Sequence, residues 1–188
     1  VGTLADCALI EQELRWIVDL LPRRETLSVV LITKNEARQI AECLATVAWA
    51  DEVVVVDDES TDETPALCRR AGATVITHAS DGDFDRQRNL GIEAARGDWI
   101  LQMDADERIP QTLRLELELL LGSRPQVSGM AIRRANWFLR RRVRFGGWDG
   151  WGVKLFRRGA GRYVGRSVHE TLRLEGAVGR CEAAVEHY

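Results

Sequence analysis

Four short apolar runs alternate with helical segments in the first two thirds of the chain, and this alternation restricts the fold more than any other feature. The runs are LSVVLIT (27–33), VVVV (53–56), ATVITH (73–78) and WILQMD (99–104). A short continuous apolar run such as LSVVLIT is typical of a strand buried on both faces of a sheet. Strands that alternate with helices at this interval form βαβ units. We therefore predict an α/β, Rossmann-like fold with a mainly parallel sheet and helices on both faces.

Helix boundaries are expected at capping residues and glycines. Two pairs have the spacing of a capping box, in which a Ser or Thr and a Glu three residues later cap the same helix: Thr33/Glu36 and Ser60/Glu63. We expect helices that begin at these pairs and end near Val47 and Gly72. A third helix is expected to be closed by Gly97, and a fourth to begin at Pro110 and stop at Gly122.

The chain divides into three parts, and its length and 45% hydrophobic content suffice for one core. Residues 1–26 form an N-terminal extension with an amphipathic helical pattern at 8–21. Residues 27–127 carry the strand–helix units. Residues 128–188 read as short strands joined by Gly turns, a smaller mixed or antiparallel C-terminal part of the same domain. Because the chain lacks an initiator Met and ends just after EHY, we expect a fragment that is truncated at its C-terminus.

Charge is distributed unevenly between the two main parts. Residues 1–127 hold 13 Lys and Arg against 24 Asp and Glu, whereas residues 128–188 hold 13 against 5. This asymmetry favours a front half that uses a cation and a back half that faces an anionic group, such as a phosphate, an acidic glycan or a lipid headgroup. An ordinary solvated Arg-rich surface explains the back half equally well. We expect no nucleic-acid partner.

Several features bear on the compartment. No run of about 18 uncharged apolar residues occurs, and acidic residues interrupt the opening segment where a secretory signal would be apolar. The cysteines lack CxxC spacing, so neither a zinc site nor a disulfide framework is indicated and a reducing compartment fits: Cys7, Cys43, Cys68 and Cys181. We expect a cytoplasmic protein. The helix at 8–21 and the Arg-rich segment 133–144 are candidates either for contact with the inner face of the cytoplasmic membrane or for packing on protein.

Acidic residues follow two of the predicted strands. Asp57 and Asp58 come after the second run, and Asp104 and Asp106 after the fourth. In open α/β sheets ligands bind beyond the carboxyl ends of the strands, so both groups should face one crevice. Residues i and i+2 of an extended chain point to the same side. Two such carboxylates about 5 Å apart repel by roughly 3 kcal/mol at an effective dielectric of about 20, and Glu107 adds to this.

A cation between Asp104 and Asp106 would offset that repulsion. Carboxylate oxygens on a strand-end loop suit Mg²⁺ or Mn²⁺, which complete their coordination with water and substrate phosphates. The DxD pattern alone is a weak signal, since a pair of solvated loop acids looks the same. Its position after a strand and the second acidic turn make a metal site the stronger interpretation.

These residues together carry a family resemblance. LSVVLITKNE, VVVVDDESTDET and QRNLGIEAARGDWILQMDADE resemble the nucleotide-sugar-binding half of family 2 inverting glycosyltransferases, which have the GT-A fold. RRANWFLRRRVRFGGWDGWGVKLFRR, RYVGRSVHE and the closing HY are most similar to the branch of lipopolysaccharide-core β-1,4-glucosyltransferases and other cell-envelope sugar transferases. The resemblance covers about residues 26–188. Two positions depart from it: Glu59, where many members have Gly, and Lys154, where the branch usually has Arg.

The resemblance implies a transferase that moves a hexose to a hydroxyl of a cell-envelope glycan or glycolipid, with inversion, and the expected donor is a UDP-sugar. It implies that Lys34, Asn35 and Glu36 border the nucleoside pocket and that Asp57 and Asp58 contact the base or ribose. The metal that bridges the diphosphate would then be held by Asp104, Asp106 and, by the same resemblance, His187. Arg86 and Arg88, at a helix start near the crevice, are either phosphate contacts or an ordinary charged helix turn.

Inverting transfer also needs a base that takes the proton from the acceptor hydroxyl. Because the donor occupies the front half, the base should come from residues 128–188, which hold few acids: Asp149, Glu170, Glu175, Glu182 and Glu186. Glu170, in VHE, is the first candidate by resemblance. Asp149 is the second, in a Gly-rich aromatic segment able to stack on a sugar. His169 either orients Glu170, binds phosphate or is structural.

Two other protein classes remain open. A phosphoacceptor receiver domain also orders an acidic pair, a later Asp and a Lys, as in Asp57, Asp58, Asp104 and Lys154. A complete strand–helix unit precedes the acidic pair here, however, and no Lys-Pro follows. The other class is a nucleotide-binding module without catalysis.

Overall fold

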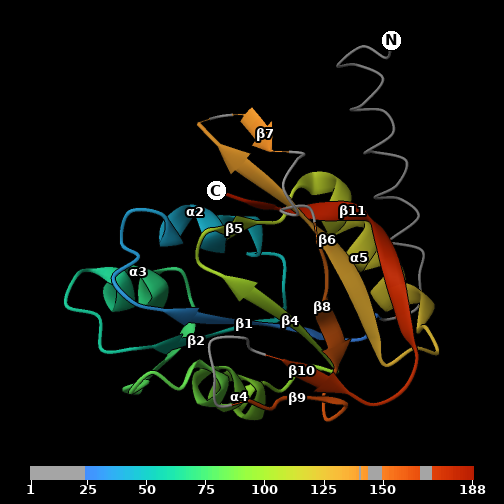
Figure 1. Ribbon diagram of the computed structural model, residues 1–188, viewed down its shortest axis with the longest axis horizontal. Coiled ribbons are helices and arrows are strands. Elements are labelled where there is room, and N and C mark those ends of the chain that lie inside the picture. Colours follow the sequence, from blue (N-terminus) through green and yellow to red (C-terminus); the bar gives the residue numbers. More distant parts are fainter. Residues whose placement is uncertain (1–23, 140, 144–149, 166–170) are drawn as a thin grey trace.

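The computed structural model describes residues 24–139, 141–143, 150–165 and 171–188 (Figure 1). The expected helix at 8–21 lies outside these residues. The strands are β1 (Leu27–Thr33), β2 (Glu52–Asp57), β3 (Thr74–Thr77), β4 (Trp99–Asp104), β5 (Glu107–Arg108), β6 (Gly129–Phe138), β7 (Arg141–Val143), β8 (Trp151–Arg157), β9 (Gly161–Tyr163), β10 (Leu172–Leu174) and β11 (Val178–His187). The helices are α2 (Ile40–Thr46), α3 (Thr64–Arg70), α4 (Phe84–Ala94) and α5 (Gln111–Ser123).

Nine of the described strands form one mixed sheet in the order β3-β2-β1-β4-β8-β6-β11-β5, with β7 paired to β6. The four strands predicted from apolar runs are confirmed, and β1 pairs in parallel with β2 and β4. β8 then runs antiparallel to both β4 and β6. The mixed C-terminal part expected from the sequence therefore continues the same sheet. β9 and β10 form a separate small antiparallel pair.

Alternation along β1 builds a core on each face of the sheet. Val29 and Leu31 are fully buried in a cluster with side chains of α2, α3 and α5. Val30 points to the other face, in a cluster with Ile92 of α4. α4 approaches β1 so closely that a Cβ at Gly91 would collide with Val30. Helices therefore cover both faces, as predicted (Figure 1).

Both predicted capping boxes are wrong, because Thr33 and Ser60 occupy other positions and do not cap a helix. Thr33 ends β1 and is buried. α2 begins only at Ile40, after Asn35 turns the chain with a φ of 56°. Ser60 accepts a hydrogen bond from the Asn35 N–H at 2.8 Å. The loops after β1 and β2 are thereby tied to each other at the carboxyl ends of their strands.

Two glycines expected as helix stops have different roles. α4 ends at Ala94, and Gly97 instead lies against β1, where a Cβ would stand 2.6 Å from the Ser28 nitrogen. Gly122 is buried inside α5, and the left-handed residue that ends this helix is Arg124. Gly72 does follow α3 with a φ of 86°, as expected.

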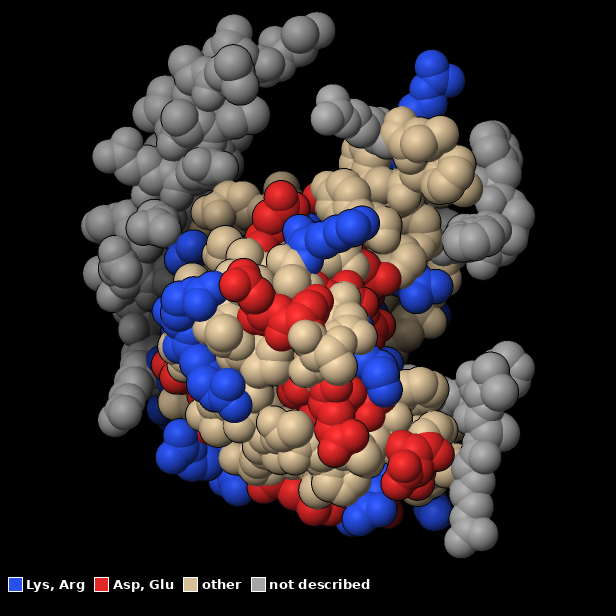
Figure 2. Space-filling model, turned by 90° about the vertical axis from the view of Figure 1, so that its left-hand side faces the viewer, with Lys and Arg blue, Asp and Glu red and all other residues tan. Residues whose placement is uncertain are grey.

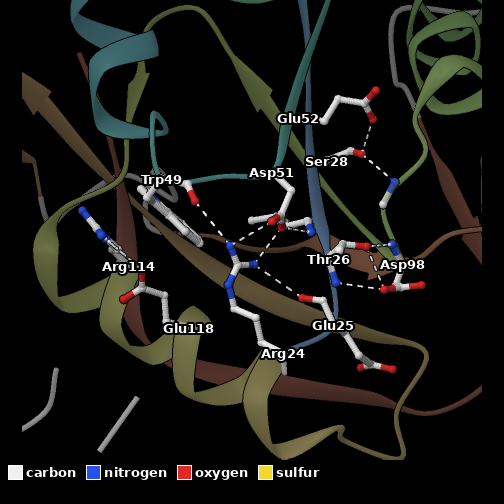
Figure 3. Close-up of polar contacts among 12 residues, drawn as sticks. Arg24, Glu25, Thr26, Ser28, Trp49, Asp51, Glu52, Asp98, Arg114 and Glu118 are labelled. Atoms are coloured by element: carbon white, nitrogen blue, oxygen red, sulfur yellow. Dashed lines mark hydrogen bonds and ion pairs between the residues drawn. The ribbon is translucent and has the colours of Figure 1, made fainter. Parts of the chain in front are cut away.

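Polar contacts fasten the amino ends of the parallel strands, opposite the acidic loops (Figure 3). The Ser28 hydroxyl donates to Oε2 of Glu52 at 2.5 Å and accepts from the Gly97 N–H at 2.8 Å. The other oxygen of Glu52 accepts from Nε of Arg96 at 2.8 Å. The N–H and the hydroxyl of Thr26 both donate hydrogen bonds to Oδ2 of Asp98. The start of β1 is thus linked to β2 and to the segment before β4.

We predict that Glu52→Gln lowers the free energy of unfolding by about 1–3 kcal/mol at neutral pH, because charge-assisted hydrogen bonds to a mostly buried carboxylate are lost. Burial raises the pKa of Glu52, but the bonds from Ser28 and Arg96 outweigh it and hold the pKa below 4.5. The contribution of Glu52 to the free energy of unfolding is therefore fully present above about pH 4.5 and is lost as the pH falls through the folded-state pKa. Urea unfolding should show the difference from wild type shrinking below about pH 4.

Glu93→Gln is the matched control, because the Glu93–Arg162 pair is exposed on both sides. We expect it to change the free energy of unfolding by less than about 0.5 kcal/mol. Equal losses in the two variants would contradict the role given to Glu52.

No described helix is long and apolar enough to span a bilayer. The three described cysteines, Cys43, Cys68 and Cys181, are buried free thiols. Burial raises the pKa of Cys43 and Cys181 to about 12, so these thiols stay protonated at neutral pH.

Candidate active site

The carboxyl ends of β1, β2 and β4 meet at one side of the molecule, where a pocket lies. Its lining comes from the loops after these three strands and from α4: Ile32, Thr33, Lys34, Glu36, Asp58, Phe84, Gln87, Asp104, Ala105 and Asp106. Figure 2 shows this side, with acidic side chains gathered over the middle of the face and basic ones beside them. The structure therefore brings both predicted acidic loops to one crevice.

Asp58 is buried in the pocket wall and is held from two directions. Oδ1 accepts from the Ser80 N–H at 2.7 Å, and Oδ2 accepts from the Ser80 hydroxyl and from Lys34 Nζ, both at 2.8 Å. Burial raises the pKa of Asp58, but these hydrogen bonds outweigh it and hold the pKa below its ordinary range. Asp58 is thus an ionised, fixed acceptor, and the Lys34 side chain beside it is 59% exposed.

The neighbours of Lys34 and Asp58 shape the pocket rim. Asp57 is buried, and its Oδ2 accepts from the Ser60 N–H at 3.0 Å. Oδ1 of Asn35 accepts from the Thr61 N–H at 2.8 Å. Glu36 accepts from the Gln39 side chain at 2.6 Å. Asp57 and Asn35 therefore brace the two loops, whereas Lys34, Glu36 and Asp58 line the pocket itself.

Asp104 ends β4 beside a buried cation. Its Oδ1 accepts from a guanidinium nitrogen of Arg88 at 2.9 Å. Arg88 is 8% exposed and also lies over the ring of Tyr163. Burial raises the pKa of Asp104, but the charges of Lys154 and Arg88 outweigh it and hold the pKa below its ordinary value. Asp104 is therefore ionised, and its side chain remains 33% exposed to the pocket.

Asp106 lies next to β11, the last strand in the sequence. Oδ2 is 3.2 Å from Nε2 of His187, which belongs to β11. Oδ1 is buried and has no hydrogen-bond partner among the described residues. The backbone of the two segments is joined as well, because the Tyr188 N–H donates to the Asp106 carbonyl at 3.1 Å. His187 and Asp106 are thus neighbours in the structure although 81 positions separate them in the sequence.

Glu107 is buried completely and forms an ion pair with Lys154 of β8, at 2.7 Å from Nζ to Oε1. Glu107 therefore does not add the repulsion expected from the sequence, because its charge is paired with that of Lys154. Arg88 and Lys154 bring positive charge to this loop. The loop can therefore fold without a bound ion. Support for a metal site here comes from the ligand chemistry of the side chains.

The donor set still fits a hard divalent cation. Asp104 and Asp106 present carboxyl oxygens to the pocket, and the His187 imidazole lies beside Asp106. One Asp106 oxygen is buried without a hydrogen-bond partner in the described part of the chain. No group of three or more His, Cys, Asp or Glu among the described residues is close enough to hold an ion by itself. An ion here would complete its coordination with water and phosphate oxygens, as Mg²⁺ and Mn²⁺ do.

The other predicted site residues are placed differently. Arg86 lines a neighbouring groove between α4 and β9, with Arg162 and Tyr163. Asp149, His169 and Glu170 lie outside the described residues. Ser80 was missed as a contributor to the site, because it stands in no recognisable local pattern. Lys154 was noted as a departure from the resemblance, but its ion pair with Glu107 was not expected.

Comparison with known proteins gives a consistent result. The model of the Glycosyl transferase family 2 matches residues 28–173. An uncharacterized glycosyltransferase of Rickettsia felis is 41% identical over 103 residues, which is 54% of this chain and 36% of the relative. The lipopolysaccharide core biosynthesis glycosyltransferase LpsC of Rhizobium meliloti is 30% identical over 169 residues, 81% of this chain and 59% of LpsC. The chain thus spans less than two thirds of either relative.

Solved structures agree with this match. S. aureus TarS 1–349 in complex with UDP has a TM-score of 0.53 and 27% identity, covering 65% of this chain and 39% of TarS. The mannosyltransferase PcManGT of Pyrobaculum calidifontis, in complex with GDP-Man and Mn²⁺, has a TM-score of 0.50 and 27% identity, covering 66% of this chain and 42% of PcManGT. The fold is that of the GT-A glycosyltransferases.

Proposed function

The chain belongs to glycosyl transferase family 2, and from this we propose that it transfers a hexose from a UDP-sugar to a hydroxyl of a cell-envelope glycan or glycolipid. The transfer inverts the anomeric centre and depends on Mg²⁺ or Mn²⁺. The reaction takes place in the cytoplasm or at the inner face of the cytoplasmic membrane. The name of LpsC supports the cell-envelope acceptor, and the UDP complex of TarS supports the donor nucleotide.

The observation that carries this proposal is the convergence of Asp58, Asp104 and Asp106 on one pocket at the carboxyl ends of β2 and β4. This is where open α/β sheets bind ligands. Asp58 offers a fixed ionised acceptor for hydroxyl or N–H groups of a nucleoside, and Lys34 offers an exposed cation beside it. Asp104, Asp106 and His187 would hold a divalent ion, which neutralises charge on the departing diphosphate.

The remaining step belongs to the C-terminal part. A base must take the acceptor proton as the hydroxyl attacks the anomeric carbon. We keep Glu170 as this base, with Asp149 as the second candidate and His169 as the residue that orients Glu170 or binds phosphate. Arg86 and Arg88 remain proposed contributors near the phosphates. Arg88 would act through Asp104, since it is bound to that carboxylate.

A thermal-shift panel of nucleotides and nucleotide sugars, each with Mn²⁺, with Mg²⁺ or with chelator, tests the proposal. We expect UDP and one UDP-sugar to raise the unfolding midpoint, and the metal to increase that shift. Absence of any metal-dependent shift across the panel would refute the donor assignment.

A nucleotide-binding module without catalysis is the second candidate, because the pocket lined by Asp58, Asp104 and Asp106 could bind a nucleotide without any group that activates an acceptor. Metal-dependent UDP binding without any hydrolysis or transfer would support it. The phosphoacceptor receiver alternative is dropped, because the chain belongs to a glycosyltransferase family and Lys154 is paired with Glu107.

We propose in addition that the β6–β7 hairpin contacts an anionic membrane surface. Phe138 and Leu139 at its turn are 69% and 82% exposed, and the exposed Arg141 follows them. Apolar side chains beside cations suit a bilayer interface with anionic lipids. We expect the double variant Phe138→Ser/Leu139→Ser to weaken sedimentation with phosphatidylglycerol vesicles at least about tenfold.

Val164→Ser is the control for this experiment, because Val164 is 46% exposed and lies outside the hairpin. It should sediment with the vesicles as wild type does. Equal sedimentation of the hairpin variant and the control would remove the hairpin from the proposal.

A further inference from the structure

We propose that Lys154 is a positioning residue, which acts through Glu107 to fix the loop that carries Asp104 and Asp106. This inference rests on the proposed function, since it assigns the loop to a metal and a diphosphate. Lys154 lies on β8, in the C-terminal half of the sheet, and is separated from the loop by 47 positions.

The contact is buried and involves both oxygens of one carboxylate. Lys154 Nζ lies 2.7 Å from Oε1 and 2.8 Å from Oε2 of Glu107. Glu107 is 0% exposed and the Lys154 side chain 16%. Oε2 also accepts from the Asp104 N–H at 3.1 Å. One carboxylate therefore joins β8 to the backbone of the first loop aspartate.

Glu107 is connected to the second aspartate as well. Its backbone pairs with His187 where β5 meets β11, and the His187 ring is 3.2 Å from Asp106. Glu107 thus contacts Asp104 through its side chain, and its backbone pairs with His187, which contacts Asp106. A shift of its side chain or backbone would be transmitted to Asp104 through the N–H and to Asp106 through His187.

Loss of the Lys154 cation would disturb this arrangement in a predictable way. A carboxylate left alone in a fully buried site is strongly unfavourable, so Glu107 would turn toward water and leave the Asp104 N–H. The side chains of Asp104 and Asp106 would keep their chemistry but lose their fixed geometry. Partners that orient metal ligands in this way typically change metal affinity about 10- to 100-fold when they are removed.

A second ion pair on the same strand provides a matched control. Arg157, three positions after Lys154, is the last residue of β8 and lies 2.9 Å from Glu25. Arg157 also lies over the Trp99 ring and donates to two backbone carbonyls. Loss of Arg157 should reduce stability without changing the contacts of the loop that carries Asp104 and Asp106.

The test compares Lys154→Met, Lys154→Arg and Arg157→Met in calorimetric titrations of UDP, with saturating Mn²⁺ and with chelator. We expect Lys154→Met to weaken Mn²⁺-dependent UDP binding about tenfold or more, with metal-free UDP binding within about twofold of wild type. Lys154→Arg should recover most of the Mn²⁺-dependent affinity. Arg157→Met should lower the unfolding midpoint but bind UDP and Mn²⁺ as wild type does.

The double variant Lys154→Met/Glu107→Met keeps the test decisive if Lys154→Met does not fold. Removing both charges should restore stability, yet the Mn²⁺-dependent binding should stay weak because the Asp104 N–H still lacks its acceptor. Wild-type affinity in the double variant, or an equal loss in Arg157→Met, would overturn the positioning role. Failure of the wild-type chain to bind UDP with Mn²⁺ would instead overturn the proposed function, and this inference with it.

Discussion

Asp106→Asn is expected to remove metal-dependent UDP binding and to reduce sugar transfer about 100- to 1,000-fold, the usual effect of losing one preorganised group that stabilises transition-state charge. The substitution keeps the shape of the side chain and replaces one oxygen with an amide group. Oδ1 of Asp106 is buried without a partner among the described residues, so the loss falls on the ion rather than on the fold. Calorimetry with UDP and Mn²⁺ measures the first effect and a transfer assay the second.

Asp106 is a cleaner choice than Asp104 for this experiment. Asp104→Ala should also abolish metal-dependent binding, but it would leave the buried Arg88 guanidinium without its carboxylate, and loss of folding would then confuse the result. Asp98→Asn is the control, since Asp98 stands immediately before β4 and binds Thr26 at the other end of that strand. Unchanged metal-dependent binding in Asp106→Asn would refute the assigned role.

Glu170→Gln is expected to leave donor binding intact and to lower turnover about 100-fold or more, because a general base contributes at least this much to proton abstraction. The amide cannot accept a proton at neutral pH but occupies nearly the same volume. UDP binding with Mn²⁺ should therefore be unchanged in this variant, while the rate of steady-state transfer should fall. The comparison variant is Asp149→Asn, and near-normal turnover in Glu170→Gln would transfer the role of base to Asp149.

The parallel half of the fold is predictable because its signal is local. β1 and β4 are continuous apolar runs, and their burial on both faces explains that pattern. β5 was not predicted, and β11 is one strand of ten residues where only short strands were expected. β11 alternates small, charged and apolar residues, and its register with β6 shifts between Arg180 and Ala184. Such a strand is defined by its partners rather than by its own composition.

The sequence predicts the site residues that directly follow a strand. It does not predict contacts between residues that are far apart in the sequence. Strand ends placed Asp58, Asp104 and Asp106 correctly in one pocket. The contacts of Lys154 with Glu107 and of Arg88 with Asp104 join elements far apart in the sequence, and no spacing rule predicts such pairs. The capping boxes failed for a related reason, since Ser60 binds the loop after β1 in preference to its own helix.

The antiparallel pairing of β8 with β4 has a consequence for protein engineering. Residues 99–101 of β4 pair with residues 155–157 of β8, so a continuous hydrogen-bonded ladder joins residues 27–127 to residues 128–188. A chain cut after residue 127 would expose the edge of β4, which would then be prone to aggregation. Chimeras that exchange the C-terminal part between relatives should therefore place the crossover away from this pair and take both strands from one parent.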